Sequence, residues 1–200
     1  MLKEKFEQIL EILEAVTLNP YRFPELAKTR KKELGFISEL VTVFASLGLS
    51  VGAVYMTPPY TKSWQISILV MSTVFYLFFR ILPLLFAAFA DHSIRKSRER
   101  KENVMLAVLA SRILLAVFIL FTPFSVILVQ SGLSGGRVYY ALFVFFMLLY
   151  LYLAAKMLSV LYELEFKATI AVVLKSLGLV FVFPLLFNIV FGHSIVKFLE

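Results

Sequence analysis

Residues 64–90 read WQISILVMSTVFYLFFRILPLLFAAFA, and the only charged side chain among them is that of Arg80. An α-helix needs about 20 mostly apolar residues to cross a hydrocarbon core about 30 Å thick. Lipid offers no hydrogen-bonding partner to the backbone, and a helix satisfies its own backbone groups. This stretch therefore predicts a transmembrane helix.

Four further stretches have the same character. The predicted spans are 36–56, 64–90, 103–130, 137–162 and 168–191. The alternation of apolar and polar residues that is typical of a lipid-facing β-barrel is absent. The whole chain is 60% apolar and 16% charged, whereas soluble domains are about half apolar and about a quarter charged. We therefore predict an all-α integral membrane bundle of five transmembrane helices, with residues 36–192 as its domain.

Lysine and arginine are distributed unevenly between the two sides of this bundle. Segments 1–35, 91–102 and 163–167 fall on one side and contain seven, five and one basic residues, against three on the other side. Loops rich in Lys and Arg stay in the cytoplasm. We predict a cytoplasmic N-terminus and an outer C-terminal tail of residues 193–200, in the cell's inner or plasma membrane.

The cytoplasmic segment 1–35 combines an amphipathic helix with basic residues. Apolar side chains recur at helical spacing over residues 1–18, and Pro20 predicts the end of that helix. Its polar face carries mostly Glu, unlike helices that lie in the lipid interface, so we expect it to dock against its own bundle or a second copy. Pro24 predicts the start of another helix, which continues through Lys32 towards the first span.

Five charged residues lie inside predicted spans: Glu39, Arg80, Arg112, Lys156 and Lys175. Counted from the cytoplasmic ends of their helices, Arg80 and Arg112 lie about 15 and 13 Å deep. One interpretation is a basic pocket that binds an anionic lipid head group of the inner leaflet, or an acidic segment of a partner. The alternative is that the two arginines pair with Glu39 or with backbone carbonyls while the lysines extend to the interface.

Prolines and small residues interrupt the predicted spans. Pro83, Pro123 and Pro184 predict either hinges or static kinks, because each removes a helical hydrogen bond. Gly48 and Gly52 form a small-x-x-x-small pattern that permits close helix packing, within the bundle or in a dimer.

Several classes of function lack support in the sequence. The chain has no cysteine, and its two histidines, His92 and His193, fall on opposite sides of the membrane and cannot share a metal. Glycine-rich phosphate loops and nucleophile elbows are absent. The basic residues flank apolar spans, where anionic lipid is a nearer partner than nucleic acid. We therefore predict no enzymatic activity, no cofactor and no nucleic-acid partner.

From about Leu18 to Gly192, the order of features is similar to that of the Yip-domain superfamily of small membrane proteins. The features are the proline-and-aromatic entry Asn19–Pro24, a charged loop after the second span, Ser111-Arg112 and Pro123 in the third span, and the link from residues 150–156 through 162–171 into the last span. The Asp-Leu-Tyr-Gly-Pro motif and the long N-terminal region of eukaryotic members are absent, which indicates a prokaryotic relative.

The resemblance implies a membrane organiser, since eukaryotic members of that superfamily help organise vesicle traffic and bind lipid-modified Rab GTPases. We predict a non-enzymatic scaffold or adaptor that associates with itself or with other membrane proteins. A small transporter or channel lined by Arg80 and Arg112 is the alternative, although the outer halves of the spans are almost purely apolar. A lipid-modifying enzyme is a third hypothesis, for which the sequence offers no set of acid, base and nucleophile.

Overall fold

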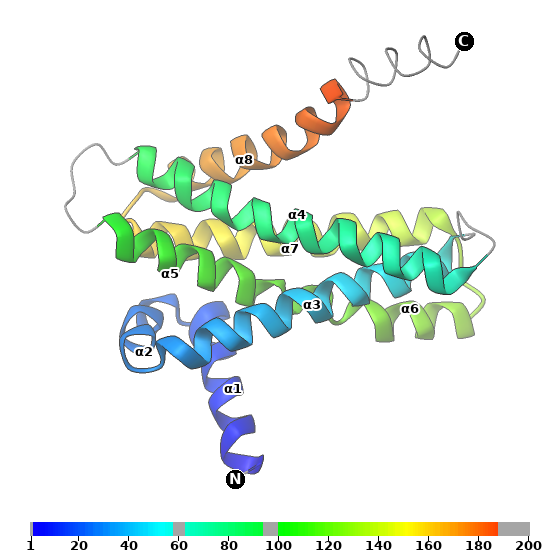
Figure 1. Ribbon diagram of the computed structural model, residues 1–200, viewed down its shortest axis with the longest axis horizontal. Coiled ribbons are helices and arrows are strands. Elements are labelled where there is room, and N and C mark those ends of the chain that lie inside the picture. The colour runs from blue at the N-terminus through cyan, green and yellow to red at the C-terminus, as the bar shows by residue number, and fades with distance from the viewer. Residues whose placement is uncertain (1, 58–62, 94–99, 188–200) are drawn as a thin grey trace.

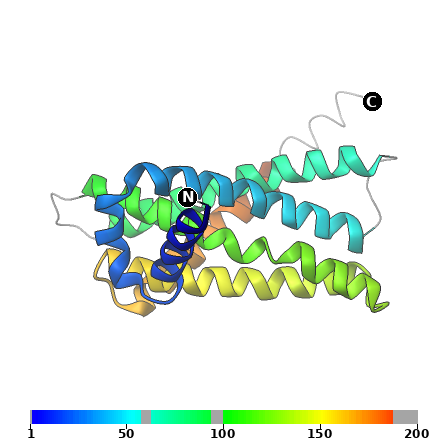
Figure 2. The same ribbon diagram turned by 90° about the horizontal axis from the view of Figure 1, so that it is seen from below.

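The computed structural model describes residues 2–57, 63–93 and 100–187, which form helices joined by short turns, with no strand among them. The α-helices are α1 (Leu2–Thr17), α2 (Phe23–Thr29), α3 (Lys31–Met56), α4 (Trp64–Ser93), α5 (Arg100–Ile113), α6 (Phe121–Gln130), α7 (Gly136–Leu161) and α8 (Phe166–Phe187), and the 3₁₀ segments are η1 (Pro20–Arg22) and η2 (Leu114–Phe118). Helices α3 to α7 follow the long axis of the molecule, α8 is inclined against α4 and α7, and α1 projects from the bundle at a steep angle to the long helices (Figure 1, Figure 2).

Four segments of the described chain are long and apolar enough to cross a membrane. They are α3, α4, Asn103–Gln130 and α7, so the prediction of an all-α protein with long apolar helices is confirmed to this extent. The fifth predicted span, 168–191, corresponds to α8 as far as Phe187. Its last residues and the predicted outer tail, 193–200, lie outside the described residues.

The chain before α3 bends where the sequence predicts a continuous helix from Pro24 through Lys32, so that prediction is wrong. Helix α2 ends at Thr29, and Arg30 leaves helical geometry with φ −126° and ψ 35°. Arg30 Nη1 lies 3.1 Å from Glu11 Oε2, on α1. This ion pair links the bend to the N-terminal helix.

Helix α1 ends at Thr17, just before the Asn19-Pro20 pair that predicts its end. Ile12 and Val16 in its second half are buried against the rest of the chain, whereas Leu10 is half exposed. Helix α1 runs across the long helices and not along them (Figure 2). Its C-terminal half therefore docks on its own bundle.

The third span is interrupted near its middle. Helix α5 ends at Ile113, η2 follows, and α6 begins only at Phe121. The Ile119 amide donates to the carbonyl of Ala116, 3.1 Å away, which is the tighter three-residue spacing. Pro123 has no N–H to donate to the carbonyl of Ile119, and the interruption lies directly before it. By contrast, α4 continues through Pro83.

Helix α3 presents a face of small residues to the interrupted span. A Cβ atom added to Gly48 would lie 2.8 Å from the backbone oxygen of Phe118, and one added to Gly52 would lie 2.4 Å from Cδ1 of Phe121. Both approaches are closer than real Cβ contacts allow, so only glycine permits this separation of the two spans. The glycine pair therefore packs within the bundle.

Aromatic rings fill the space between the other helices. Phe118 of η2 is fully buried, and its ring centroid lies 5.1 Å from that of Phe79 on α4 and 5.8 Å from that of Tyr150 on α7. Ring pairs at such separations add to the stability gained from burial. The η2 interruption is thus buried in the core of the bundle.

Candidate functional site

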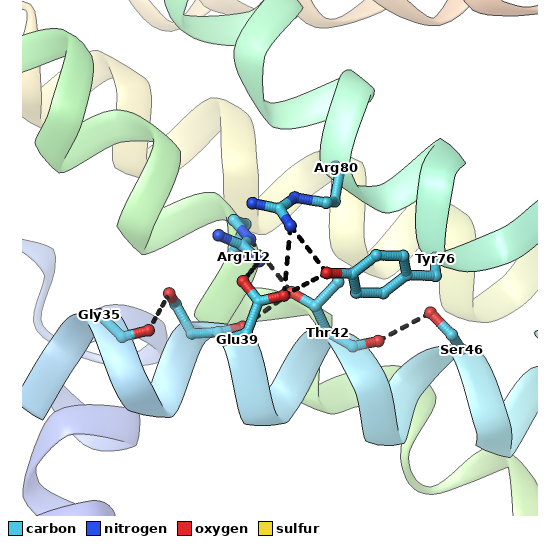
Figure 3. A network of polar contacts seen from close by, with 8 residues as sticks. Gly35, Glu39, Thr42, Ser46, Tyr76, Arg80 and Arg112 are labelled. Atoms are coloured by element: carbon cyan, nitrogen blue, oxygen red, sulfur yellow. Dashed lines mark hydrogen bonds and ion pairs between the residues drawn. The ribbon is translucent and has the colours of Figure 1, made fainter. Parts of the chain in front are cut away.

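Three helices meet at a polar cluster, which we define as Glu39 of α3, Tyr76 and Arg80 of α4, and Arg112 of α5. The Glu39 carboxylate accepts a hydrogen bond from the Tyr76 hydroxyl and forms ion pairs with both arginines. Its Oε1 lies 3.4 Å from Arg80 Nη1, and its Oε2 accepts from Arg112 Nη2. In Figure 3 the four side chains converge between the helices.

Arg112 is the buried member of the cluster. Its side chain is only 10% exposed, and its Nε donates to Thr42 Oγ1 at 3.2 Å. Thr42 in turn donates to the carbonyl of Ser38 at 2.7 Å. These bonds and the ion pair with Glu39 hold the guanidinium in place, so Arg112 joins α5 to α3.

Arg80 is the accessible member. Its side chain is 48% exposed, and that of Glu39 is 40% exposed. Arg80 Nη1 donates to the Tyr76 hydroxyl at 2.7 Å, and the guanidinium carbon lies 5.5 Å from the centre of the Tyr76 ring. Tyr76 is one helical turn from Arg80, so the aromatic face and hydroxyl position the cation. The cluster is therefore closed around Arg112 and open at Arg80.

The charges of the cluster do not cancel. One carboxylate faces two guanidinium groups, which leaves one unbalanced positive charge. Arginine keeps its proton under physiological conditions and offers a planar fork of donors, so the guanidinium groups of the cluster are suited to holding an anion. Phosphate and carboxylate oxygens are the acceptors that match this fork.

The two lysines predicted as part of a basic pocket lie apart from this cluster. Lys156 on α7 is partly buried and Lys175 on α8 is exposed, and the side-chain amino group of neither forms an ion pair or hydrogen bond within the described chain. Helix α8 turns Val172 and Ser176 inward, and this leaves Lys175 on its outer face. The structure thus brings Glu39, Arg80 and Arg112 together, as in the pairing alternative, and leaves both lysines out.

Two uncharged residues of the site are not predicted from the sequence: Tyr76, which belongs to the cluster, and Thr42, which bonds to Arg112. Tyr76 lies four residues before Arg80, the spacing at which helical side chains meet. Thr42 belongs to a series at four-residue spacing on α3 that is buried and bonded to its own helix: Ser38, Thr42, Ser46 and Ser50. Four hydroxyl residues at that regular spacing are the signal that could have found it.

The described part of the chain has no group of three or more His, Asp or Glu side chains that could hold a metal ion. Comparisons of the chain with protein-family models, with curated proteins and with solved structures give no match. The similarity to the Yip-domain superfamily stays a prediction from the sequence, and the site is interpreted from its own geometry.

Proposed function

We propose that this protein is a non-enzymatic membrane scaffold or adaptor of Yip-like type that binds an anionic lipid head group of the inner leaflet at Arg80. The observation that carries the proposal is the unbalanced positive charge of the cluster, presented by a half-exposed arginine on a surface whose other exposed side chains are mostly apolar. A charge exposed at an apolar surface is costly in lipid and marks a functional site. An anionic head group neutralises it.

The proposed topology has five spans with the N-terminus in the cytoplasm. The end of α4, the start of α5 and the turn between α7 and α8 lie at the same end of the bundle as α2 (Figure 1). The sequence segments at that end carry 13 of the 20 Lys and Arg residues, which supports its assignment to the cytoplasm. In this topology α8 is the fifth span, and the exposed half of α1 is available to another copy or to other membrane proteins.

The level of the cluster in the bilayer supports a head-group site. Each of its charged residues lies 16 to 18 residues from the outer end of its span, which is Met56 for Glu39, Trp64 for Arg80 and Gln130 for Arg112. At 1.5 Å per residue the two separations that follow a continuous helix, on α3 and α4, are about 24 to 26 Å, close to the full thickness of a core of about 30 Å. In the proposed topology the cluster accordingly lies at the inner edge of the core, and the cytoplasmic ends of the helices project beyond it.

Replacing Arg80 by glutamine is expected to remove most of the bound anionic lipid. The variant loses the accessible guanidinium, and the cluster becomes neutral. Native mass spectrometry of protein purified in mild detergent, titrated with dioleoyl phosphatidylglycerol, measures the effect. We expect affinity to fall about tenfold, as for the loss of one charge-assisted contact of about 1.4 kcal/mol.

Lys175→Gln is the matched control, because it removes the same charge from an exposed position on a neighbouring span that is outside the cluster. It should leave phosphatidylglycerol binding unchanged. Equal losses in the two variants would mean that only net charge matters, and the proposal would then be wrong. Anion flux through reconstituted vesicles that Arg80→Gln abolishes would instead favour a transporter.

A further inference from the structure

The surface beside the cluster contains a groove between α3 and α4. It has a volume of about 240 Å³ and is lined by Val43, Ser46 and Leu47 on one side and by Leu69, Ser72, Thr73 and Tyr76 on the other. Val43, Leu47 and Leu69 are exposed. The groove therefore opens on the outer, lipid-facing surface of the bundle.

The groove begins at the cluster itself. Tyr76 lines it and also donates to Glu39, and the guanidinium of Arg80 lies over the Tyr76 ring. From Tyr76 to Leu69 the groove follows α4 for seven residues, or about 10 Å. It runs away from the cytoplasmic end of α4, the direction in which the chains of an inner-leaflet lipid extend from their phosphate.

The lining of the groove suits a hydrocarbon chain. Its hydroxyl groups on Ser46 and Thr73 donate to carbonyls of their own helices, at 2.7 and 2.9 Å. These two hydroxyl groups therefore need no polar partner from a ligand. The third lining hydroxyl, that of Ser72, has no hydrogen-bond partner in the described chain, but it is buried and not exposed at the groove surface. Contact with a chain in the groove is van der Waals packing, the interaction that lipid-facing surfaces offer.

We infer that the ligand of this site is a glycerophospholipid with full-length acyl chains, whose phosphate binds Arg80 and one of whose chains lies in the groove between α3 and α4. The inference rests on the proposed head-group site and adds a second, independent contact to it. It distinguishes a membrane phospholipid from a soluble phosphate. It also assigns the groove to a lipid acyl chain and not to a second copy of the protein.

Filling the groove tests the inference. Thr73→Phe places a ring in the groove from an exposed position, whereas Val74→Phe places the same ring on the neighbouring exposed position of α4, outside the groove. In the same titration with dioleoyl phosphatidylglycerol, we expect Thr73→Phe to weaken binding at least about threefold and Val74→Phe to leave it unchanged. Leu69→Trp repeats the test from a second lining position if Thr73→Phe does not fold.

The outcomes separate the two proposals. If Arg80→Gln loses lipid binding while Thr73→Phe and Leu69→Trp bind fully, the head-group site is supported. The proposal that the groove holds an acyl chain is then wrong. Full binding in Arg80→Gln would overturn both. Displacement of the bound lipid by inorganic phosphate as effectively as by full-length phosphatidylglycerol would identify a free phosphate as the ligand and overturn the inference. A change of oligomeric state in Thr73→Phe with unchanged lipid content would assign the groove to a second copy and overturn it as well.

Discussion

Replacing Arg112 by glutamine is expected to lower the free energy of unfolding by about 1.5 to 3 kcal/mol, the range for hydrogen bonds to charged groups. The variant loses the bonds that join α5 to Glu39 and to Thr42. It also leaves Glu39 with a single arginine on the exposed side of the cluster. Equilibrium unfolding of the purified protein in mixed micelles with increasing dodecyl sulfate measures the change.

A double-mutant cycle shows whether the loss comes from the pair. Glu39→Gln combined with Arg112→Gln removes both charges, so the double variant should be more stable than the sum of the single losses predicts. Lys175→Gln, which removes a charge outside the cluster, should leave the unfolding midpoint unchanged. Additive losses in the cycle would show that the ion pair does not join α3 to α5.

Replacing Gly52 by leucine is expected to have a comparable effect through packing. Any Cβ at this position would lie 2.4 Å from Cδ1 of Phe121 and 2.8 Å from the Ser125 hydroxyl, and Phe121 is fully buried. Helices α3 and α6 must therefore separate, at a cost of about 3 kcal/mol, as for a strongly overpacked core. The same unfolding titration measures it.

Gly178→Leu provides the control for the loss of a helical glycine. Gly178 lies on α8, where a Cβ would meet nothing within 4 Å, so leucine there should be neutral or slightly stabilising because it favours the helix. If Gly52→Leu were as stable as Gly178→Leu, the close packing of α3 on the interrupted span would be contradicted.

The long apolar helices could be predicted from sequence because lipid restricts a spanning chain to few structures. Four spans follow directly from runs of about 20 apolar residues. The bend at Arg30 could not be predicted in this way, because the ion pair found at the bend joins Arg30 to Glu11 on a separate helix. The η2 interruption packs against Gly48 of another helix. Pro123 indicates from the sequence that the third predicted span is disturbed, but not this packing.

The sequence shows which charged residues lie inside the predicted spans, but it does not show which of them meet in the cluster. Charges inside apolar runs are conspicuous, so Glu39, Arg80 and Arg112 were identified together with Lys156 and Lys175. Which of them meet depends on how each helix is rotated about its axis, and hydrophobicity indicates this poorly when all faces of a helix are apolar. The rotation of α8 excludes Lys175, and that of α4 brings in the uncharged Tyr76.

In the proposed function, Arg80 holds the phosphate of an anionic lipid at the inner edge of the bilayer. An experimental structure of the protein in nanodiscs of phosphatidylcholine and phosphatidylglycerol tests it most directly. We predict density for a phosphate group within hydrogen-bonding distance of the Arg80 guanidinium, with a chain continuing past Tyr76 between α3 and α4. A guanidinium bonded only to Glu39 and Tyr76, with lipid phosphates elsewhere around the bundle, would contradict the claim.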